Sequence, residues 1–146
     1  MISIRPTKPS DFDEWSKLYY GYAEFYKVPM NAEIQSSLWG WLMDENHEVQ
    51  GLLALLDRVP CGFAHVRRMP SPLRGTDIGF LDDLFVSPSA RGNKVGEALF
   101  GELKSLAAQK GWTKIRWITA DDNYRARGLY DQLSKKPQWN TYEMET

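Results

Sequence analysis

The sequence predicts one α/β (α+β) domain over residues 1–146, with a mixed, mostly antiparallel central sheet flanked by helices. Two observations support this prediction. An apolar strand at 76–86, an amphipathic helix to about 110 and a strand at 115–118 form a strand–helix–strand unit, whose right-handed crossover makes the two strands parallel. Before it, apolar runs at 49–56 and 59–69 flank Asp57-Arg58 and predict an antiparallel hairpin.

The N-terminal part predicts a strand followed by two helices. Ile2 to Pro6 alternates as a short strand. Aromatic and apolar residues then recur at helical spacing from Ser10, a candidate N-cap, to Tyr26. After the Val28-Pro29-Met30 break, a second helix is expected over 31–43. Its buried stripe is expected to be Ile34, Leu38, Trp41 and Leu42.

The C-terminal half completes the order βααβββαβαβ. A loop with two prolines is expected over 70–75. The helix before Gly111 carries one apolar face, and Gly111 is the residue type that ends helices. A further helix over 123–133 and a last strand over 139–144 are predicted.

Composition excludes several classes of protein. The chain has 146 residues, enough for one real core, and 42% of them are hydrophobic. A net charge of −1 predicts neither a nucleic-acid nor a membrane partner. The one cysteine, Cys61, excludes an intrachain disulfide and fits a reducing compartment. No signal-peptide pattern, membrane-length apolar run or metal-ligand spacing is present, so we expect a cytoplasmic protein without a metal.

The stretch Arg91-Gly92-Asn93-Lys94-Val95-Gly96 is the most informative part of the chain. It joins the strand at 76–86 to the following helix. A tight loop before a helix collects unpaired backbone N–H groups and the positive end of the helix dipole at one place. Such a place binds phosphate groups, so the sequence predicts a cofactor that carries phosphate.

Three motifs together resemble the GNAT superfamily of acetyl-CoA-dependent N-acetyltransferases. The loop 91–96 is similar to the family's acyl-CoA loop, Arg/Gln-x-x-Gly-x-Gly/Ala. Leu81 to Val86 resembles its central strand, and Asn123 to Tyr130 matches Asn-x-x-Ala-x-x-x-Tyr. The resemblance covers almost the whole chain and implies the GNAT acyl-CoA N-acyltransferase fold, with acetyl-CoA as cosubstrate. It also suggests a homodimer.

The resemblance implies a set of residues that bind the cofactor. The pantetheine arm is expected to pair with backbone groups near Phe85 and Val86, where the central strand splays from its parallel neighbour. The pyrophosphate is expected on the N–H groups of the loop, with Arg91 either contacting it or orienting the loop. Asn123 is expected to hydrogen-bond the cofactor. The full expected set is Phe85, Val86, Arg91, Gly92, Asn93, Lys94, Val95, Gly96, Asn123 and Tyr130.

Lys94 departs from the family pattern, which most often has glycine at this position. If the position needs a positive φ, lysine costs roughly 1 kcal/mol or more relative to glycine. Alternatively the residue has ordinary helical angles. Its ammonium lies either near phosphate or in solvent.

Two adjacent carboxylates, Asp82 and Asp83, are the candidates for the base that the reaction needs. An alkylammonium has a pKa near 10.4, so forming the neutral amine at pH 7 costs roughly 4–5 kcal/mol. Strand alternation is expected to place the two carboxylates on opposite faces. We favour Asp82, acting through a water or by attracting the substrate, with Asp83 as the alternative. His65 is expected to be structural, with a role in the acceptor pocket as the alternative.

Tyr130 is the candidate acid. The resemblance implies that it assists the leaving thiolate, although its pKa near 10 against about 8.5 for a thiol makes full proton transfer uphill by roughly 2 kcal/mol. The sequence therefore predicts catalysis by Asp82 and Tyr130. A backbone N–H near Phe85 or Val86 is expected to stabilise the oxyanion.

The predicted acceptor is a primary amine on a small molecule, with polyamine-like or diamine acceptors favoured. Amino acids, aminoglycosides and protein lysines are the other candidates. Tyr19 to Tyr26, Trp39 and the 70–75 loop are expected at the acceptor end. The alternative function is a non-catalytic acyl-CoA sensor or interaction module on the same fold. A nucleotide-binding enzyme fits poorly, because the loop lacks a P-loop or Gly-x-Gly-x-x-Gly pattern.

Overall fold

A computed structural model describes residues 1–119 and 123–146 of the chain. The order of helices and strands along the chain is the predicted one as far as residue 133. They are β1 (Ile2–Pro6), α1 (Phe12–Tyr26), α2 (Ala32–Leu42), β2 (Val49–Leu56), β3 (Val59–Ser71), β4 (Thr76–Val86), α3 (Val95–Lys110), β5 (Ile115–Arg116) and α4 (Tyr124–Leu133).

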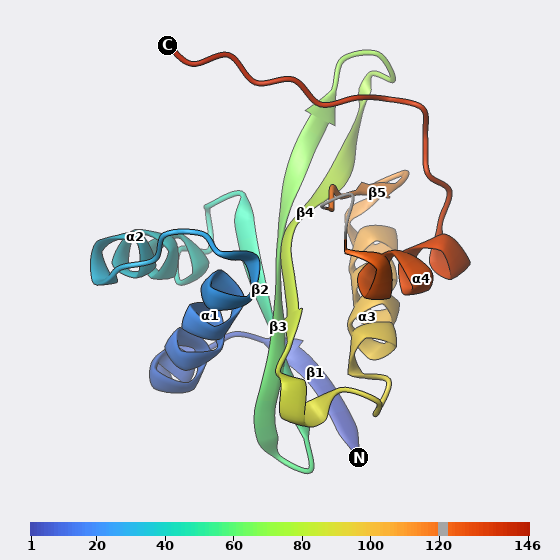
Figure 1. The fold of residues 1–146 in the computed structure, drawn as a ribbon. Helices are drawn as coiled ribbons and strands as arrows, with labels where there is room; N and C mark the ends of the chain where they lie inside the picture. Colours follow the sequence, from blue (N-terminus) through green and yellow to red (C-terminus); the bar gives the residue numbers. More distant parts are fainter. Residues whose placement is uncertain (120–122) are drawn as a thin grey trace.

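Within the described residues the strands form one sheet in the order β1-β2-β3-β4-β5. The first four strands pair antiparallel, and β4 pairs with β5 in parallel. Helices α1 and α2 lie on one side of the long β3–β4 hairpin, and α3 and α4 lie on the other (Figure 1). The predicted mixed, mostly antiparallel sheet flanked by helices is confirmed.

Two apolar cores hold the helices on the sheet. One packs α3 against alternate residues of the strands through Leu52, Ala64, Val66, Leu81, Leu99 and Leu103, and the other packs α1 and α2 through Trp15, Tyr19, Leu38, Leu53, Phe63 and Phe85. Leu52 and Leu53 are neighbours on β2 that enter different cores, as alternation requires. The sheet is therefore buried on both faces.

A bulge in the third strand pair breaks this alternation on β4. His65 pairs with Asp83 but Val66 pairs with Leu81, so Asp82 is an extra residue with no partner on β3. As a result Leu81 packs in the α3 core, whereas Phe85, four residues later, packs in the α1 core. The prediction that Asp82 and Asp83 point to opposite faces was wrong, because the inserted residue turns both side chains into one cavity.

Helix α1 begins differently from the prediction. Pro9–Asp11 forms a short 3-10 turn, and Ser10 does not cap the helix. Instead Asp11 accepts a hydrogen bond from the backbone N–H of Lys8 and two from the guanidinium of Arg5, at 2.8 Å, 2.7 Å and 2.8 Å. This carboxylate fastens the start of α1 to β1.

Helix α2 buries less of its apolar stripe than predicted. Asn31 caps it by accepting the Ile34 N–H at 2.8 Å. Leu38 is buried, but 41% of Ile34 and 47% of Trp41 are exposed. The helix contacts the sheet mainly at β2, and these two side chains line an open cavity instead. Helix α2 therefore forms one wall of this cavity.

The predicted last strand over 139–144 is wrong. The chain after Ser134 has no regular secondary structure, and Trp139, Tyr142 and Met144 are each at least 80% exposed. In Figure 1 the tail leaves α4 and runs past the end of the β3–β4 hairpin. A strand needs a neighbouring edge, and β5 supplies only two paired residues. The homodimer remains a prediction.

No helix among the described residues combines the length and the apolarity that a membrane span requires.

Candidate active site

The parallel pair β4–β5 opens after only two residue pairs. Gly79 pairs with Ile115 and Phe80 with Arg116, and no further pair is formed between the described parts of these strands. The remainder of β4 therefore presents one edge without a strand partner. Such an edge binds an extended chain by main-chain hydrogen bonds. Phe85 and Val86, two predicted cofactor-binding residues, lie on this part of β4.

A cavity of about 370 Å³ occupies the opening and is called the donor cavity below. It brings together parts of the chain that are far apart in sequence, from α1, β4, the segment after β5 and α4. Asp82 and Tyr130, the two predicted catalytic residues, both line it. The other lining residues are Tyr22, Tyr26, Leu81, Leu84, Trp117, Ile118 and Thr119.

The loop before α3 presents free backbone donors beside this opening. Among the described residues, the N–H groups of residues 92–97 have no backbone acceptor, and the first helical bond at this end runs from Ala98 to Lys94. The side chain of Asn93 donates to the Ala90 carbonyl at 3.0 Å and so holds the loop in shape. Arg91 lies over the ring of Phe25, 4.9 Å from its centroid, which orients it from α1. A loop of this form binds diphosphate.

Lys94 has the positive φ that the sequence left open. It is the N-cap of α3 at φ 63° and ψ 26°, and Gly92 has φ 85°. A side chain in this left-handed region costs roughly 1–2 kcal/mol. The sequence therefore carries backbone strain where glycine is usual in the family.

Lys94→Gly is accordingly expected to raise the free energy of unfolding by about 0.5–1 kcal/mol, because relief of the strain exceeds the entropy gained by the unfolded chain. Urea unfolding measures this change. Gly92→Ala serves as the opposite control and is expected to lose about 1 kcal/mol or more at its φ of 85°. A loss of stability in Lys94→Gly would show that the ammonium makes a native contact stronger than the strain.

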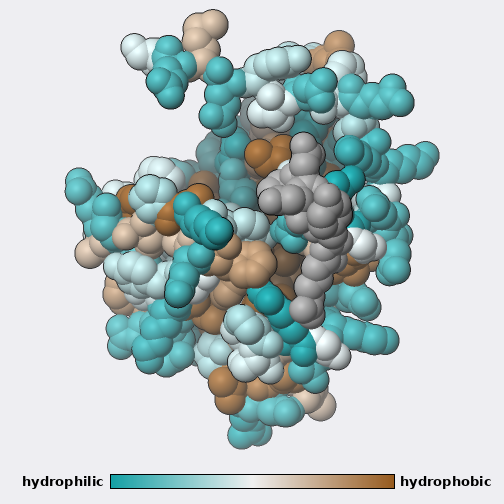
Figure 2. All heavy atoms as spheres, viewed as in Figure 1, coloured by the Kyte–Doolittle hydropathy of each residue, from teal (hydrophilic) through white to brown (hydrophobic). Residues whose placement is uncertain are grey.

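A second cavity, of about 580 Å³, lies on the α1–α2 side of β4 and is called the acceptor cavity below. Its wall mixes acidic, aromatic and apolar side chains: Tyr19, Glu33, Ile34, Ser37, Leu38, Trp41, Val49, His65, Arg67, Asp82 and Asp83. Apolar side chains gather in the middle of the face between the α1–α2 side and the α3–α4 side, surrounded by hydrophilic ones (Figure 2). Trp39 and residues 70–75, which the sequence placed at the acceptor end, are not among the residues that line this cavity, and β3 continues to Ser71 where the loop was expected to begin at residue 70.

Asp83 is held by a buried chain of hydrogen bonds. Trp15 Nε1 donates to His65 Nε2 at 3.0 Å, and His65 Nδ1 lies 2.8 Å from Asp83 Oδ2. An indole N–H only donates, so Nε2 of His65 is the acceptor and Nδ1 carries the proton toward Asp83. His65 is only 1% exposed. His65 is thus buried in the core, as expected for a structural residue, and it also orients the carboxylate of Asp83.

The charge of Asp83 is stabilised by this network. Burial raises the pKa of Asp83, but the hydrogen bonds from His65, Tyr22 and Tyr19 lower it by more. The pKa of Asp83 therefore lies below the usual aspartate value. Tyr19 donates to Asp83 at 3.4 Å. Burial and the neighbouring carboxylate raise the pKa values of Tyr19 and Tyr22, so both remain protonated donors. Asp83 is a fixed negative charge and a weak base.

Asp82 has the opposite environment. Burial raises its pKa above the ordinary value, despite the hydrogen bond that Arg67 donates from Nε at 2.9 Å. A third of its side-chain surface is exposed. Because the bulge places it between the two openings, Asp82 lines both the acceptor and the donor cavity. A carboxylate with a raised pKa is a better base than its neighbour.

Tyr130 lies on α4 and lines the donor cavity, whereas Asn123 is the N-cap of α4 and is not among the residues that line it. The ring of Tyr130 packs edge-on against Phe100 and Trp117, with centroids 5.7 Å and 5.5 Å away. Burial, and to a smaller extent Tyr26, raises the pKa of Tyr130 to about 12. Asn123 caps α4 by accepting from Ala126, and its amide donates to the Tyr26 hydroxyl at 3.2 Å. The predicted cofactor ligand Asn123 therefore also ties α4 to α1.

Sequence reasoning missed Arg67 and Glu33, which line the acceptor cavity. The tyrosine cluster on α1 was expected at the acceptor end, but only Tyr19 is among the residues that line the acceptor cavity, whereas Tyr22 and Tyr26 line the donor cavity. Among the described residues, no group of three or more histidine, cysteine or acidic side chains could hold a metal ion.

Comparison with known proteins defines the class of this site. A model of the Acetyltransferase (GNAT) family matches residues 11–134, and the chain belongs to this family. It is 28% identical over 137 residues to the D-amino-acid N-acetyltransferase HPA3 of Saccharomyces cerevisiae, covering 92% of this chain and 85% of the relative. It is 27% identical over 150 residues to a thialysine N-epsilon-acetyltransferase of Caenorhabditis elegans, covering 99% and 92%.

A solved structure shares the fold over the whole chain. The structure of AAC(6')-Iy in complex with the bisubstrate analog CoA-S-monomethyl-acetylneamine superposes with a TM-score of 0.85 at 17% identity, covering 100% of this chain and 98% of that one. The protein is thus an acetyl-CoA-dependent N-acetyltransferase that acts on amine substrates. The unpaired edge of β4, the free N–H groups of residues 92–97 and the donor cavity fit acetyl-CoA as its cosubstrate.

Proposed function

We propose that this enzyme acetylates a primary amine of a small diamine-like acceptor by direct attack, with Asp82 as the base and Tyr130 as the acid. One observation supports this most strongly: Asp82 lines both cavities, so a carboxylate lies where an amine in one meets an acyl group in the other. Tyr130 lines the donor cavity with it.

The acidic lining of the acceptor cavity favours a cationic acceptor. Glu33, Asp82 and Asp83 contribute three carboxylates, against the one guanidinium of Arg67. Asp83, held ionised by its network, attracts the reactive ammonium, and Glu33 lies on α2 where it can attract a second one. This distribution supports a molecule with two amines. The relatives named for D-amino acids and thialysine also support a small amine acceptor.

The chemistry then follows from these side chains. Acetyl-CoA supplies an acetyl thioester. Asp82 takes a proton from the ammonium, and the nitrogen lone pair forms the new C–N bond as the C–S bond breaks. The thiolate leaves with the bonding electrons, accepts a hydrogen bond from the hydroxyl of Tyr130 and then takes up one proton. The second amine proton and the proton held by Asp82 pass to water, which restores the base, so each turnover releases one proton net.

The remaining groups position the reactants. The N–H groups of residues 92–97 and Arg91 would bind the diphosphate, and the open edge of β4 at Phe85 and Val86 would bind the pantetheine arm. A backbone N–H on this edge would stabilise the negative charge that develops on the acyl oxygen. The aromatic walls from α1 exclude water.

A thiol-release screen tests the proposal. Purified protein with acetyl-CoA is offered polyamines, diamines, amino acids, aminoglycosides and a lysine peptide, and free thiol is followed by absorbance. We expect the fastest release with a small molecule that carries two amines. If acetyl-CoA binds but no amine releases thiol, the non-catalytic acyl-CoA sensor is supported. Highest activity with an aminoglycoside or a lysine peptide would contradict the proposed acceptor class.

A further inference from the structure

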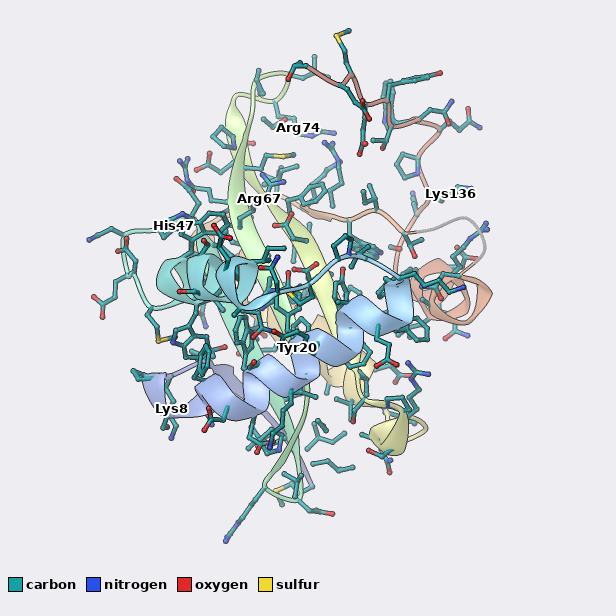
Figure 3. The ribbon with its side chains drawn as sticks, turned by 60° about the vertical axis from the view of Figure 1, so that its left-hand side comes forward. Lys8, Tyr20, His47, Arg67, Arg74 and Lys136 are labelled. Carbon is teal, nitrogen blue, oxygen red and sulfur yellow. The ribbon has the colours of Figure 1, made fainter. Side chains whose placement is uncertain are left out.

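Among the described residues that line the acceptor cavity, Arg67 carries the one guanidinium, and three others carry carboxylates. It extends from β3 on the side of the sheet where α1 and α2 lie (Figure 3). Its Nε donates to Asp82 Oδ2 at 2.9 Å, and its guanidinium lies over the ring of Phe80, 4.7 Å from the centroid. The described residues provide no hydrogen-bond partner for its two terminal nitrogens.

In this arrangement only Nε of the Arg67 guanidinium has a hydrogen-bond partner among the described residues. The stacking on Phe80 fixes the plane of the group, and 38% of the side-chain surface is exposed. A guanidinium binds a carboxylate best through two parallel N–H donors, whereas Asp82 engages only Nε. The exposed terminal nitrogens can therefore accept a carboxylate that enters the cavity.

The pairing also restrains Asp82. A base must offer its oxygens to the ammonium, yet Arg67 occupies one of them and lowers the proton affinity of the carboxylate. Without the hydrogen bond from Arg67, burial would raise the pKa of Asp82 further and make it a stronger base. The charged and titratable groups that share the two cavities with Asp82 are Tyr19, Tyr22, Tyr26, Glu33, His65, Arg67, Asp83 and Tyr130.

We propose that the acceptor carries a carboxylate besides its two amines, that Arg67 binds this carboxylate, and that this exchange frees Asp82 to receive the proton of the reactive ammonium. Arg67 is then the residue that selects a diamino acid over a plain diamine. The inference rests on the proposed function and narrows its acceptor class. Among the described lining residues, three carboxylates and one guanidinium give the cavity a net negative charge, which is opposite in sign to the net positive charge of an acceptor with two ammonium groups and one carboxylate.

The test compares two acceptors that differ only by a carboxylate, lysine and cadaverine, with both enantiomers of lysine included. Thiol release is measured for the wild-type protein and for Arg67→Met. A charge-assisted hydrogen bond contributes about 1.5–3 kcal/mol, so we expect the wild-type kcat/KM for lysine to exceed that for cadaverine roughly 10- to 100-fold. Arg67→Met is expected to lower the ratio of kcat/KM for lysine to kcat/KM for cadaverine to about one.

Arg68→Met is the matched control. Arg68 follows Arg67 on β3 but pairs with Glu48 and Asp77 at the surface, at 2.9 Å and 3.1 Å, and lines neither cavity. It is expected to keep the preference for lysine. The pH dependence of kcat separates two roles of Arg67, binding the carboxylate of the acceptor and releasing Asp82 to act as the base. In the wild type, the acidic limb of kcat is expected at higher pH with lysine than with cadaverine, and in Arg67→Met this difference is expected to vanish.

The outcomes distinguish this inference from the proposed function. If cadaverine and lysine are equally good acceptors of the wild type, or if Arg67→Met lowers both equally, the carboxylate role of Arg67 is refuted while the acetylation of a diamine stands. If no amine releases thiol, both proposals fall together.

Discussion

Asp82→Asn is expected to lower kcat about 10²–10⁴-fold, the contribution typical of a positioned general base. The amide keeps the size of the side chain but cannot accept the proton. Because Asp82 lies at the bulge with a third of its side chain exposed, the substitution is expected to leave the fold intact. Circular dichroism and steady-state thiol release measure the two effects.

The dependence on pH provides a second measure of the same residue. A base works only when ionised, so the rate falls as the pH drops through its pKa. Burial raises the pKa of Asp82 above the usual carboxylate value, so the acidic limb of kcat/KM is expected at a higher pH than an ordinary aspartate would give, and it is expected to disappear in Asp82→Asn. The depressed pKa of Asp83 would place such a limb lower.

Asp77→Asn is the control for this experiment, since Asp77 lies on the same strand, its carboxylate pairs with Arg68 at the surface, and it is not among the residues that line the two cavities. It is expected to retain full activity. The assignment would be overturned if Asp82→Asn remained active while Asp83→Asn lost activity, since Asp83 would then be the base.

Tyr130→Phe is expected to lower kcat about 10- to 100-fold with little change in stability. The pKa of about 12 for Tyr130 lies well above the value near 8.5 of a thiol, so a full proton transfer to the sulfur would be uphill by about 5 kcal/mol. The hydroxyl therefore acts mainly as a hydrogen-bond donor to the leaving thiolate, and water supplies the proton. A hydrogen bond to a charged group contributes about 1.5–3 kcal/mol, which sets the expected loss.

Phenylalanine preserves the edge-on packing of Tyr130 against Phe100 and Trp117, so thermal unfolding should show a melting temperature close to that of the wild type. Tyr142→Phe, in the exposed tail, is the matched control. An unchanged kcat in Tyr130→Phe would remove this residue from the mechanism. A lower melting temperature with an unchanged kcat would assign it a packing role only.

Local sequence patterns were sufficient for most of the fold. The bounds of β2 and β4 coincide with the predicted ranges, and α3 ends before Gly111, whose φ of 73° fits its expected role. These elements were predictable because their apolar periodicity and end signals agree. The tail from Trp139 to Met144 alternates like a strand but has no edge to pair with, and pairing is a property of the whole sheet.

The site was predictable only where a motif recorded it. The loop 91–96 and Tyr130 follow spacing that local sequence preserves, and the structure brings them to the same side of the sheet as the opening between β4 and β5. The common cavity of Asp82 and Asp83 depends on a one-residue shift between β3 and β4, which strand alternation does not reveal. Arg67 was missed for the same reason. Its guanidinium stacks on the ring of Phe80 because the register between β3 and β4 pairs these two residues.

The bulge in β4 places Asp82 between two cavities whose walls differ. Helix α2 lines the acceptor cavity but not the donor cavity, whereas α1 lines both. If the proposed function holds, substitutions on α2 would change which amine is accepted without altering the wall of the cavity proposed for the coenzyme.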